Sequence, residues 1–431
     1  MEQIGKYEVI LKLGEGSTAT VYLAHDPFAD RDVAIKVLDP KVLNDTGQGR
    51  IYRRLLRNEA SLAGKLLHPH IVQIYDAVLS DEQSYIVMEY VPGGTLEQFC
   101  SLGKLLPLER IVEIVFKCTR ALDYAYRLGI THRDIKPANI LFAGTGENAS
   151  SGDIKISDFG AAIQTANQTQ TQISGVGSPA YMSPQQVREV ELDHRTDIYS
   201  LGVVMYQLLA GRLPFMAANN FAMVYQICNV EPAPPSSFRS EVPAGLDAVV
   251  ARAMHKDIEG RYPTWEAFSH DLAQVFRNSQ LASRRPVFPD SEKFETLRRL
   301  PFFHEFSDVE IWEAVRISRW DEVAPDTVIL KDGESGDFFC LLTEGELRVA
   351  KNGCTLGILT DGDCFGEMAV IGRSGHVRGA DVVAQTTAKV VTIPGDGLRS
   401  ASDTCRMHFY QAFLGVLVQR LSEANVRLAA S

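Results

Sequence analysis

The sequence predicts an α+β protein built from two domains that a short linker joins. Two observations carry this prediction: β-prone segments give way to long helical segments over the first part of the chain, and short β-prone runs separated by glycines follow. We place the first domain at 1–277, with a strand-rich lobe over 1–90 and a helical lobe over 91–277. The linker is expected at 278–293 and the second domain at 294–431.

The first domain should begin with strands, because apolar and β-prone residues alternate near 7–13, 20–24 and 33–38. A helix is predicted at Arg53–Leu67, where the pattern stops before His68-Pro69. The helical lobe has its strongest helical patterns in the following ranges: Leu108–Leu128, Asp197–Leu209, Leu246–Met254 and Trp265–Phe276.

The linker is polar and basic, with Arg284-Arg285-Pro286 at its centre and no sustained period. Short helices should follow at Glu292–Leu300 and Asp308–Ser318. Turn glycines then separate β-prone runs, which predicts a small β sandwich or barrel; the runs are Val328–Lys331, Phe338–Thr343, Leu347–Lys351 and Leu356–Leu359. A final helix is predicted at about Met407–Leu428. It either caps a ligand or packs on this core, and core packing is the role we expect for most of its residues Phe409, Tyr410, Phe413, Leu414 and Leu417.

Composition narrows the class of protein. Of the 431 residues, 45% are hydrophobic and 23% charged, as in soluble globular proteins, and the net charge of −11 argues against non-specific nucleic-acid binding. Seven scattered cysteines without Cys-x-x-Cys spacing fit reduced thiols better than disulfides or zinc. No apolar run is long enough to span a bilayer, and residues 1–7 lack a signal core. We therefore expect a soluble, cytoplasmic protein.

The stretch His132–Phe142 holds the residues that are most informative about function. Phosphoryl transfer needs a carboxylate near the attacking hydroxyl, a cation on the transferred phosphate and oxygens that hold Mg²⁺. Asp134, Lys136 and Asn139 supply one of each, and Asp158-Phe159-Gly160 supplies a second metal-binding carboxylate. The two strings in this order predict a phosphoryl-transfer site.

Two upstream features fit the same chemistry. Gly14-Glu15-Gly16 lies between two predicted strands, where glycines let the backbone approach phosphates closely. Lys36 lies in an apolar strand, and Glu59 on the next helix is its natural partner. The pair would position the α- and β-phosphates of ATP.

Together these motifs closely resemble the eukaryotic-type (Hanks-type) serine/threonine protein kinases, over about Tyr7–Phe276. The resemblance implies a bilobal protein kinase fold that transfers the ATP γ-phosphate to protein serine or threonine hydroxyls. It implies Asp134 and Lys136 as the catalytic residues, and Asn139 with Asp158 as ligands of Mg²⁺, or of Mn²⁺ in its place. It also implies an ATP site in which Gly14 and Gly16 cover the phosphates and Lys36 pairs with Glu59. The adenine would pack on Val21 and Ala34, with Met88 as the gatekeeper. The backbone of Glu89 and Val91 would form the hinge that binds the adenine.

One position departs from the family pattern. Gln185 stands where these kinases usually have a glutamate that pairs with a late arginine, here Arg261. A hydrogen bond can remain, but its charge-assisted part is lost. The polar stretch before it holds Thr169, Thr171 and Ser174, and two interpretations stay open there: autophosphorylation that orders the segment, or a plain flexible loop.

A second cluster lies in the C-terminal domain. A helix start at Gly366-Glu367 would offer backbone N–H groups to an anion, and Arg378 on the following strand would add a charge-assisted pair. A glutamate beside a phosphate is useful when it accepts a hydrogen bond from a hydroxyl. A sugar phosphate is therefore the ligand that this cluster suits.

From about Phe294 to Leu428 the chain resembles the cyclic nucleotide-binding domain family, through Pro301-Phe302-Phe303, Gly336-Asp337-Phe338 and Thr343-Glu344-Gly345 as well as this cluster. The resemblance implies a jelly-roll-like β-roll with flanking helices, and cyclic AMP or cyclic GMP as effector. It places Arg378 on the cyclic phosphate, Glu367 on the ribose 2′-hydroxyl, and the backbone of Gly366, Met368 and Ala369 on phosphate oxygens. Gly379 stands where alanine, serine or threonine is frequent in the family, and the missing hydroxyl weakly disfavours cyclic GMP. Arg373 is a second candidate for the phosphate role of Arg378.

Two other functions stay open from the sequence: a non-catalytic nucleotide-binding scaffold, and an active kinase whose C-terminal domain is a docking or dimerisation module without ligand. The expected partners are a protein substrate with a serine or threonine acceptor and a cyclic nucleotide effector. Neither nucleic acid nor a membrane span is expected, and a homodimer is left open.

Overall fold

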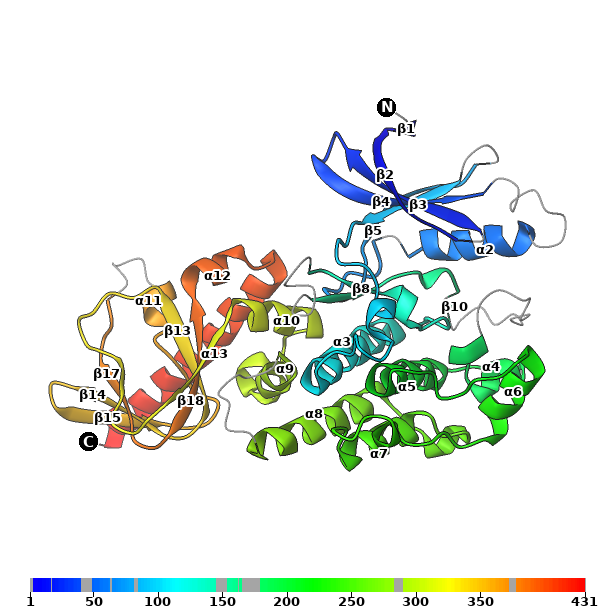
Figure 1. Ribbon diagram of the computed structural model, residues 1–431. Coiled ribbons are helices and arrows are strands. Elements are labelled where there is room, and N and C mark those ends of the chain that lie inside the picture. The colour runs from blue at the N-terminus through cyan, green and yellow to red at the C-terminus, as the bar shows by residue number, and fades with distance from the viewer. Residues whose placement is uncertain are drawn as a thin grey trace. The chain divides into compact units, whose positions relative to one another are not determined.

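The computed structural model describes residues 3–16, 18–39, 49–62, 64–80, 84–144, 153–161, 163–164, 179–282, 290–371 and 377–430. The chain divides into two compact units, Met1–Ala282 and Ser283–Ser431. Each unit combines helices with β-sheet, which confirms the predicted α+β class (Figure 1).

The first lobe of unit 1 is a six-stranded antiparallel sheet in the order β1-β2-β3-β4-β6-β5. Its strands are β1 Gln3–Ile4, β2 Tyr7–Glu15, β3 Ala19–Asp26, β4 Arg31–Leu38, β5 Ile74–Val78 and β6 Tyr85–Glu89. The core on one face includes Tyr7, Val33, Ile35 and Val87. Helix α2, Gly49–Ala60, is the predicted helix, but it ends earlier than expected because turns follow and Gly64 adopts a left-handed conformation, with φ of 71°.

The second lobe of unit 1 is helical, and its core gathers around α3 and α5. Its helices are α3 Leu108–Arg127, α4 Pro184–Val187, α5 Arg195–Ala210, α6 Asn220–Asn229, α7 Ala244–Ala253 and α8 Trp265–Ala282. Nearly every residue of α5 is buried, which explains why apolar residues occur on all sides of the helix over 198–210. Among the described residues, no helix is both long and apolar enough to cross a membrane.

Two short strand pairs flank the loops that hold Asp134 and Asp158. Strand β8, Ile140–Phe142, pairs with β9, Ile154–Ile156, and β7, Ile130–Thr131, pairs with β10, Ile163–Gln164. The loop with Asp134 therefore lies between β7 and β8, and Asp158 lies just after β9. The hairpin geometry brings these two loops to the same end of the strands.

Unit 2 holds two four-stranded antiparallel sheets, in the orders β11-β18-β13-β16 and β12-β17-β14-β15. The strands are β11 Arg319–Val323, β12 Val328–Leu330, β13 Phe338–Glu344, β14 Leu347–Lys351, β15 Cys354–Leu359, β16 Cys364–Phe365, β17 Asp381–Ala384 and β18 Ala388–Pro394. Apolar residues from both sheets, among them Cys340, Leu347 and Val390, form one core. The predicted small β sandwich or barrel is thus present.

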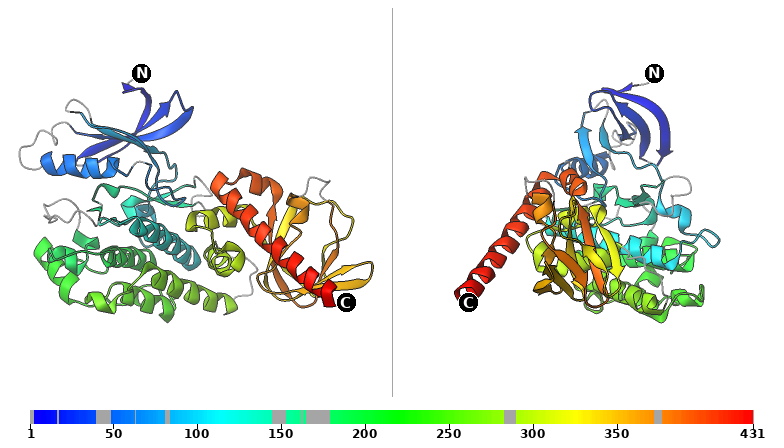
Figure 2. Two further views of the ribbon diagram at one scale, coloured as in Figure 1. Left: turned by 180° about the vertical axis from the view of Figure 1, so that it is seen from behind. Right: turned by 90° about the vertical axis from the view of Figure 1, so that its left-hand side faces the viewer.

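Helices flank the two sheets of unit 2: α9 Asp290–Arg299, α10 Asp308–Ile317, α11 Met368–Ile371, α12 Gly395–Ser400 and α13 Asp403–Ala430. Helices α8 and α9 extend into both ends of the predicted linker. Figure 2 shows α13 as one continuous helix on the outside of the sheets.

The packing of α13 differs in part from the expectation. Phe409 and Phe413 are buried in an aromatic cluster with Phe302 and Phe339. Tyr410 and Leu414 are 45% and 62% exposed, so the core packing that we predicted for most of the five residues does not extend to these two. The helical period of 3.6 residues places them on a neighbouring stripe that no strand covers in the described part of the chain.

Candidate functional site

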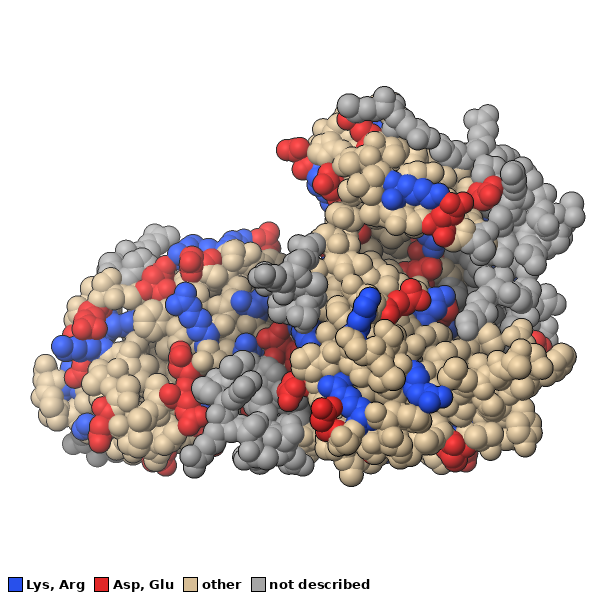
Figure 3. Space-filling model, in the orientation of Figure 1, with Lys and Arg blue, Asp and Glu red and all other residues tan. Residues whose placement is uncertain are grey.

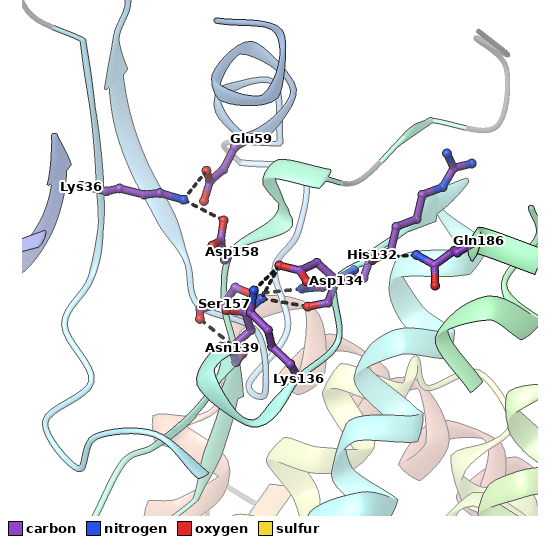
Figure 4. A network of polar contacts seen from close by, with 10 residues as sticks. Lys36, Glu59, His132, Asp134, Lys136, Asn139, Ser157, Asp158 and Gln186 are labelled. Carbon is purple, nitrogen blue, oxygen red and sulfur yellow. Dashed lines mark hydrogen bonds and ion pairs between the residues drawn. The ribbon is translucent and has the colours of Figure 1, made fainter. Parts of the chain in front are cut away.

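Lys36 joins three segments of unit 1. Its Nζ donates hydrogen bonds to Glu59 Oε2 of α2 at 3.1 Å and to Asp158 Oδ1 after β9 at 2.7 Å (Figure 4). Glu59 is only 3% exposed. The lysine that was predicted to pair with Glu59 thus contacts two carboxylates, one from each lobe.

The charged groups of this cluster shift the pKa values of Lys36 and Asp158 so that both side chains stay ionised. Desolvation lowers the pKa of Lys36, but Asp158 and Glu59 together raise it above its ordinary value. Desolvation raises the pKa of Asp158, but the adjacent Lys36 ammonium outweighs this and leaves that pKa below its usual range. Asp158 therefore stays ionised at neutral pH.

Asp134, Lys136 and Asn139 form one hydrogen-bonded group. Lys136 Nζ donates to Asp134 Oδ2 at 2.7 Å, and Asn139 Nδ2 donates to the same oxygen at 3.1 Å and to the Asp134 carbonyl at 2.8 Å. Both side-chain hydrogen bonds thus fall on Oδ2, and the described residues place none on Oδ1. The Asp134 side chain is 38% exposed, so this second oxygen can receive a proton from outside.

Asp197, at the start of α5, fixes the backbone before Asp134. Its two carboxylate oxygens accept hydrogen bonds from the N–H groups of His132 and Arg133, both at 2.7 Å. Arg133 has φ of 67°, a left-handed conformation that non-glycine residues seldom adopt. Burial raises the pKa of Asp197, and interactions with the neighbouring His132 side chain and with these two N–H groups oppose that rise. The loop is therefore held in a strained shape by a buried side chain.

The surroundings of Asn139 and Asp158 suit a hard divalent cation. The Nδ2 of Asn139 donates to Asp134, which leaves the amide oxygen as a possible metal ligand. Oδ1 of Asp158 accepts from Lys36, which leaves Oδ2. Mg²⁺ commonly takes one or two protein oxygens and fills its remaining positions with waters and substrate phosphates. Within the described ranges, no three His, Cys, Asp or Glu side chains form a cage of their own. The residues fit a magnesium ion that a phosphate ligand shares.

The sheet places the other predicted nucleotide residues on the same face as Lys36. Val21 is the cross-strand partner of Lys36, and Ala34 is the partner of Met88. Ala34 and Lys36 are two residues apart on β4, so all four side chains share one face. Figure 3 shows unit 1 hollowed between its two lobes, with acidic and basic side chains at the hollow.

Gly14 and Gly16 lie at the end of β2 and just beyond it. A Cβ atom built on Gly14 would meet no atom within 4 Å, and one on Gly16 would meet only the Ala19 carbonyl at 3.6 Å. Neither residue has a positive φ. The fold itself therefore does not require glycine at these positions. The close approach of a ligand to the backbone is a physical reason for glycine there.

Glu89 and Val91 lie at and after the end of β6. The Glu89 carboxylate pairs with Lys155 at 2.9 Å, and its N–H donates to the Gln73 carbonyl at 2.8 Å. The Glu89 side chain is thus engaged elsewhere, so any hinge contact would involve its carbonyl and the backbone of Val91.

Arg261 and Gln185 make the contact that the sequence predicted. Arg261 is 2% exposed, and its Nη2 donates to Gln185 Oε1 at 2.6 Å. Gln186, the next residue, donates from Nε2 to the Arg133 carbonyl at 2.9 Å, which ties α4 to the loop of Asp134. The predicted phosphorylation positions Thr169, Thr171 and Ser174 lie outside the described residues.

In unit 2, Glu367 and Arg378 are 1% and 5% exposed. Arg378 Nη1 donates to the Gly366 carbonyl at 2.8 Å, and its guanidinium lies 4.2 Å from the centre of the Phe338 ring. Glu367 Oε1 accepts a hydrogen bond from Arg420 Nη1 of α13 at 2.7 Å. The second polar atom of each group, Glu367 Oε2 and Arg378 Nη2, is buried and has no partner among the described residues.

Two glycines make room for the Arg378 guanidinium. A Cβ at Gly336 would lie 2.6 Å from Nη2, and one at Gly366, which has φ of 78°, would lie 2.8 Å from Nη1. Gly366 immediately precedes Glu367 and the short helix α11, which carries Met368 and Ala369. Arg373, the competing arginine, lies outside the described residues.

Comparison with known proteins identifies both units. The family model described as the protein kinase domain matches residues 7–273, and the one described as the cyclic nucleotide-binding domain matches residues 320–405. The chain belongs to the protein kinase family. Its C-terminal unit carries a cyclic nucleotide-binding domain, as the sequence resemblance predicted.

Curated relatives are bacterial kinases. A probable serine/threonine-protein kinase of Streptomyces coelicolor, SCO3848, is 38% identical over 68% of this chain and 45% of that protein. PknB of Mycobacterium leprae is 39% identical over 67% of this chain and 46% of its own length, and PrkC of Bacillus subtilis is 35% identical over 67% and 43%. The chain therefore spans less than half the length of these relatives.

The sequence did not point to Arg420 or Gln186. Arg420 is 53 residues from Glu367, and nothing in its spacing on α13 distinguishes it from a solvated helix arginine. Gln186 had a weak signal, because a serine followed three residues later by a glutamine forms a capping box, here Ser183 with Gln186.

Proposed function

We propose that this protein kinase family member is an ATP-dependent serine/threonine protein kinase. The observation that carries the proposal is the double pairing of Lys36 with Glu59 and Asp158, beside the hydrogen-bonded group of Asp134, Lys136 and Asn139. A scaffold without catalysis would have no need for ionised Asp158 next to an accessible Asp134.

In this proposal each residue has one task. Lys36, oriented by Glu59, binds the α- and β-phosphates of ATP. Asp134 Oδ1 accepts the proton of the substrate hydroxyl, and Lys136, held at Asp134 Oδ2, lies where it can neutralise charge on the transferred phosphate. The Asp-Ile-Lys-Pro string around Lys136 favours serine or threonine acceptors over tyrosine.

Asn139 and Asp158 would hold Mg²⁺, or Mn²⁺, through their remaining oxygens. When bound, the metal draws negative charge away from the phosphate oxygens. The contact with Lys36 keeps Asp158 ionised for the metal, and the hydrogen bond to Asp134 fixes the Asn139 side chain.

The test is transfer of ³²P from labelled ATP to a serine- or threonine-containing protein. Wild type should transfer label, and Asp134→Asn and Asp158→Asn should each lose about a hundredfold or more, in line with a general base and a metal ligand. Equal transfer by wild type and Asp158→Asn would refute the catalytic assignment, as would no transfer by wild type.

For unit 2 we propose that a cyclic nucleotide binds at Glu367 and Arg378 and regulates the kinase. A buried acceptor and a buried donor without partners each cost about 1–3 kcal/mol unless a ligand satisfies them. A ribose hydroxyl can donate to Glu367 Oε2, and a cyclic phosphate can accept from Arg378 Nη2. Regulation further requires that the ligand bind the active and inactive states with different affinity.

Equilibrium binding of cyclic AMP and cyclic GMP to the full chain tests this site. Arg378→Ala should weaken binding about tenfold or more, because a charge-assisted hydrogen bond is lost. Arg399→Ala is the matched control, since this exposed arginine pairs with Asp337 instead. Binding that is equal in wild type and Arg378→Ala would refute the site.

We also propose a cytoplasmic location, because all seven cysteines are free, as expected in a reducing compartment.

A further inference from the structure

Gln186 joins the loop of Asp134 to helix α4 through both ends of its side-chain amide. Its Nε2 donates to the Arg133 carbonyl at 2.9 Å (Figure 4). Its Oε1 accepts a hydrogen bond from the Ser183 N–H, also at 2.9 Å. Gln186 is only 9% exposed. A buried amide whose two ends are both bonded has a fixed orientation, so it can hold the groups that it contacts in a fixed relation to each other.

The carbonyl that Gln186 contacts belongs to the peptide group that leads into Asp134. The N–H of the same peptide group donates to His132 Nδ1 at 3.2 Å. Arg133 has φ of 67°, a left-handed conformation that a residue with a side chain keeps only when its surroundings support it. Because this peptide group sets the direction in which the Asp134 side chain leaves the backbone, a donor on its carbonyl acts on Asp134.

The other end of the amide is bonded to a buried part of the helical lobe. Ser183 is the N-cap of α4, and its hydroxyl donates to Thr196 Oγ1 in the first turn of α5 at 3.4 Å. Both residues are 0% exposed. Asp197, which accepts from the two preceding N–H groups of the loop, is the next residue of α5. The first turn of α5 therefore fixes the loop twice, directly through Asp197 and indirectly through Ser183 and Gln186.

The contact with the helix and the contact with the loop need different atoms at position 186. Glutamate and glutamine both complete a capping box here, because each supplies the acceptor for the Ser183 N–H. An ionised glutamate has no donor for the Arg133 carbonyl, since a carboxylate only accepts hydrogen bonds. The loop contact therefore requires glutamine, whereas the helix does not.

We propose that Gln186 is a positioning residue for phosphoryl transfer: its amide donor fixes the peptide group before Asp134 so that Asp134 Oδ1 faces the substrate hydroxyl. This inference rests on the proposed protein kinase activity. The two contacts of the amide lie on the loop and on α4, and neither involves the Lys36 cluster that would bind the phosphates of ATP. Loss of the donor should lower kcat and leave the affinity for ATP unchanged.

The experiment measures ³²P transfer by the full chain in Gln186→Glu and in a matched control, Gln185→Glu. In Gln186→Glu, kcat should fall about tenfold, because a hydrogen bond to a buried carbonyl is replaced by two acceptors that face each other. The Kd for ATP should stay within about twofold of the wild-type value. Gln185→Glu makes the same change on the side chain that contacts Arg261, and its kcat should not fall. Rates are expressed per molecule that binds ATP, so that unfolded protein does not count.

A double-mutant cycle with Asp134→Asn separates positioning from a general loss of structure. Because Gln186 acts through Asp134, Gln186→Glu should lower the remaining rate of Asp134→Asn by about twofold or less. Gln186→Met has a side chain of similar length but neither end of the amide. It should show the same fall in kcat together with a lower melting temperature, because the capping contact is lost as well.

Three results would overturn the inference alone. They are an unchanged kcat in Gln186→Glu, a Kd for ATP that rises as much as kcat falls, and a tenfold fall in kcat that persists in the Asp134→Asn background. In each case transfer by wild type would leave the proposed kinase activity standing. Failure of wild type to transfer label would overturn both proposals.

Discussion

Lys36 Nζ lies 2.7 Å from Asp158 Oδ1, although 122 residues separate them in sequence. The bond joins the strand-rich lobe to the loop after β9, and Glu59 completes the pairing from α2 at 3.1 Å. One ammonium group thus holds together the parts from which the proposed phosphate and metal sites are made.

The two carboxylates on Lys36 should not be equivalent. In Glu59→Gln, Asp158 still holds Lys36, so we expect kcat/KM for ATP to fall about tenfold, the value of one charge-assisted hydrogen bond. In Lys36→Met both pairings and the phosphate contact disappear, and the loss should exceed a hundredfold. Steady-state kinetics measure both, and a wild-type rate in Lys36→Met would contradict the account.

Gly16→Ala separates ligand binding from folding. Because a Cβ at Gly16 meets only the Ala19 carbonyl at an ordinary 3.6 Å, the melting temperature should not fall. The KM for ATP should rise about threefold or more if the backbone lies against the phosphates. The KM for the protein substrate serves as the internal control. A lower melting temperature with an unchanged KM for ATP would show that the glycine serves the fold.

Gln185→Glu should stabilise unit 1. Burial lowers the pKa of Arg261 to about 10, and a carboxylate in place of the Gln185 amide would give this desolvated cation a charged partner. We expect a gain of about 1 kcal/mol, or about 2–4 °C in thermal unfolding at pH 7. The introduced carboxylate takes up a proton as pH falls, so the gain should vanish in acid. A lower melting temperature at pH 7 would contradict this prediction.

Gly379→Thr should shift nucleotide preference toward cyclic GMP. A Cβ at Gly379 meets nothing within 4 Å and the residue has no positive φ, so the side chain fits without strain. The hydroxyl would supply the group whose absence weakly disfavours cyclic GMP. The ratio of the two dissociation constants should move about threefold to tenfold, the value of one neutral hydrogen bond. Gly379→Ala is the control and should not shift it.

The sequence predicted the fold class from local patterns, and the same patterns together with the family resemblance pointed to the residues of the proposed phosphoryl-transfer site. Asp134, Lys136 and Asn139 lie within one loop, so their spacing alone brings them together. Val21 and Ala34 were named from the family resemblance, and the observed strand register places them on the same face as Lys36. The pairing of Arg261 with Gln185 was also expected, from the family resemblance.

What the sequence missed depends on contacts between distant segments. Arg420 has no local pattern that links it to Glu367, and only the course of α13 across unit 2 brings them together. Tyr410 and Leu414 look like core residues by type, yet the helix turns them to the surface. Such outcomes are set by the packing of whole elements, which residue type alone does not encode.

The most direct test of the central claim is the rate of ³²P transfer by the full chain as the cyclic AMP or cyclic GMP concentration rises, in wild type and in Arg378→Ala. We predict that the rate in wild type changes and saturates with one of the two nucleotides, and that Arg378→Ala needs about tenfold more of it for the same change. A measurable rate in wild type that stays constant at every concentration of both nucleotides would contradict the account.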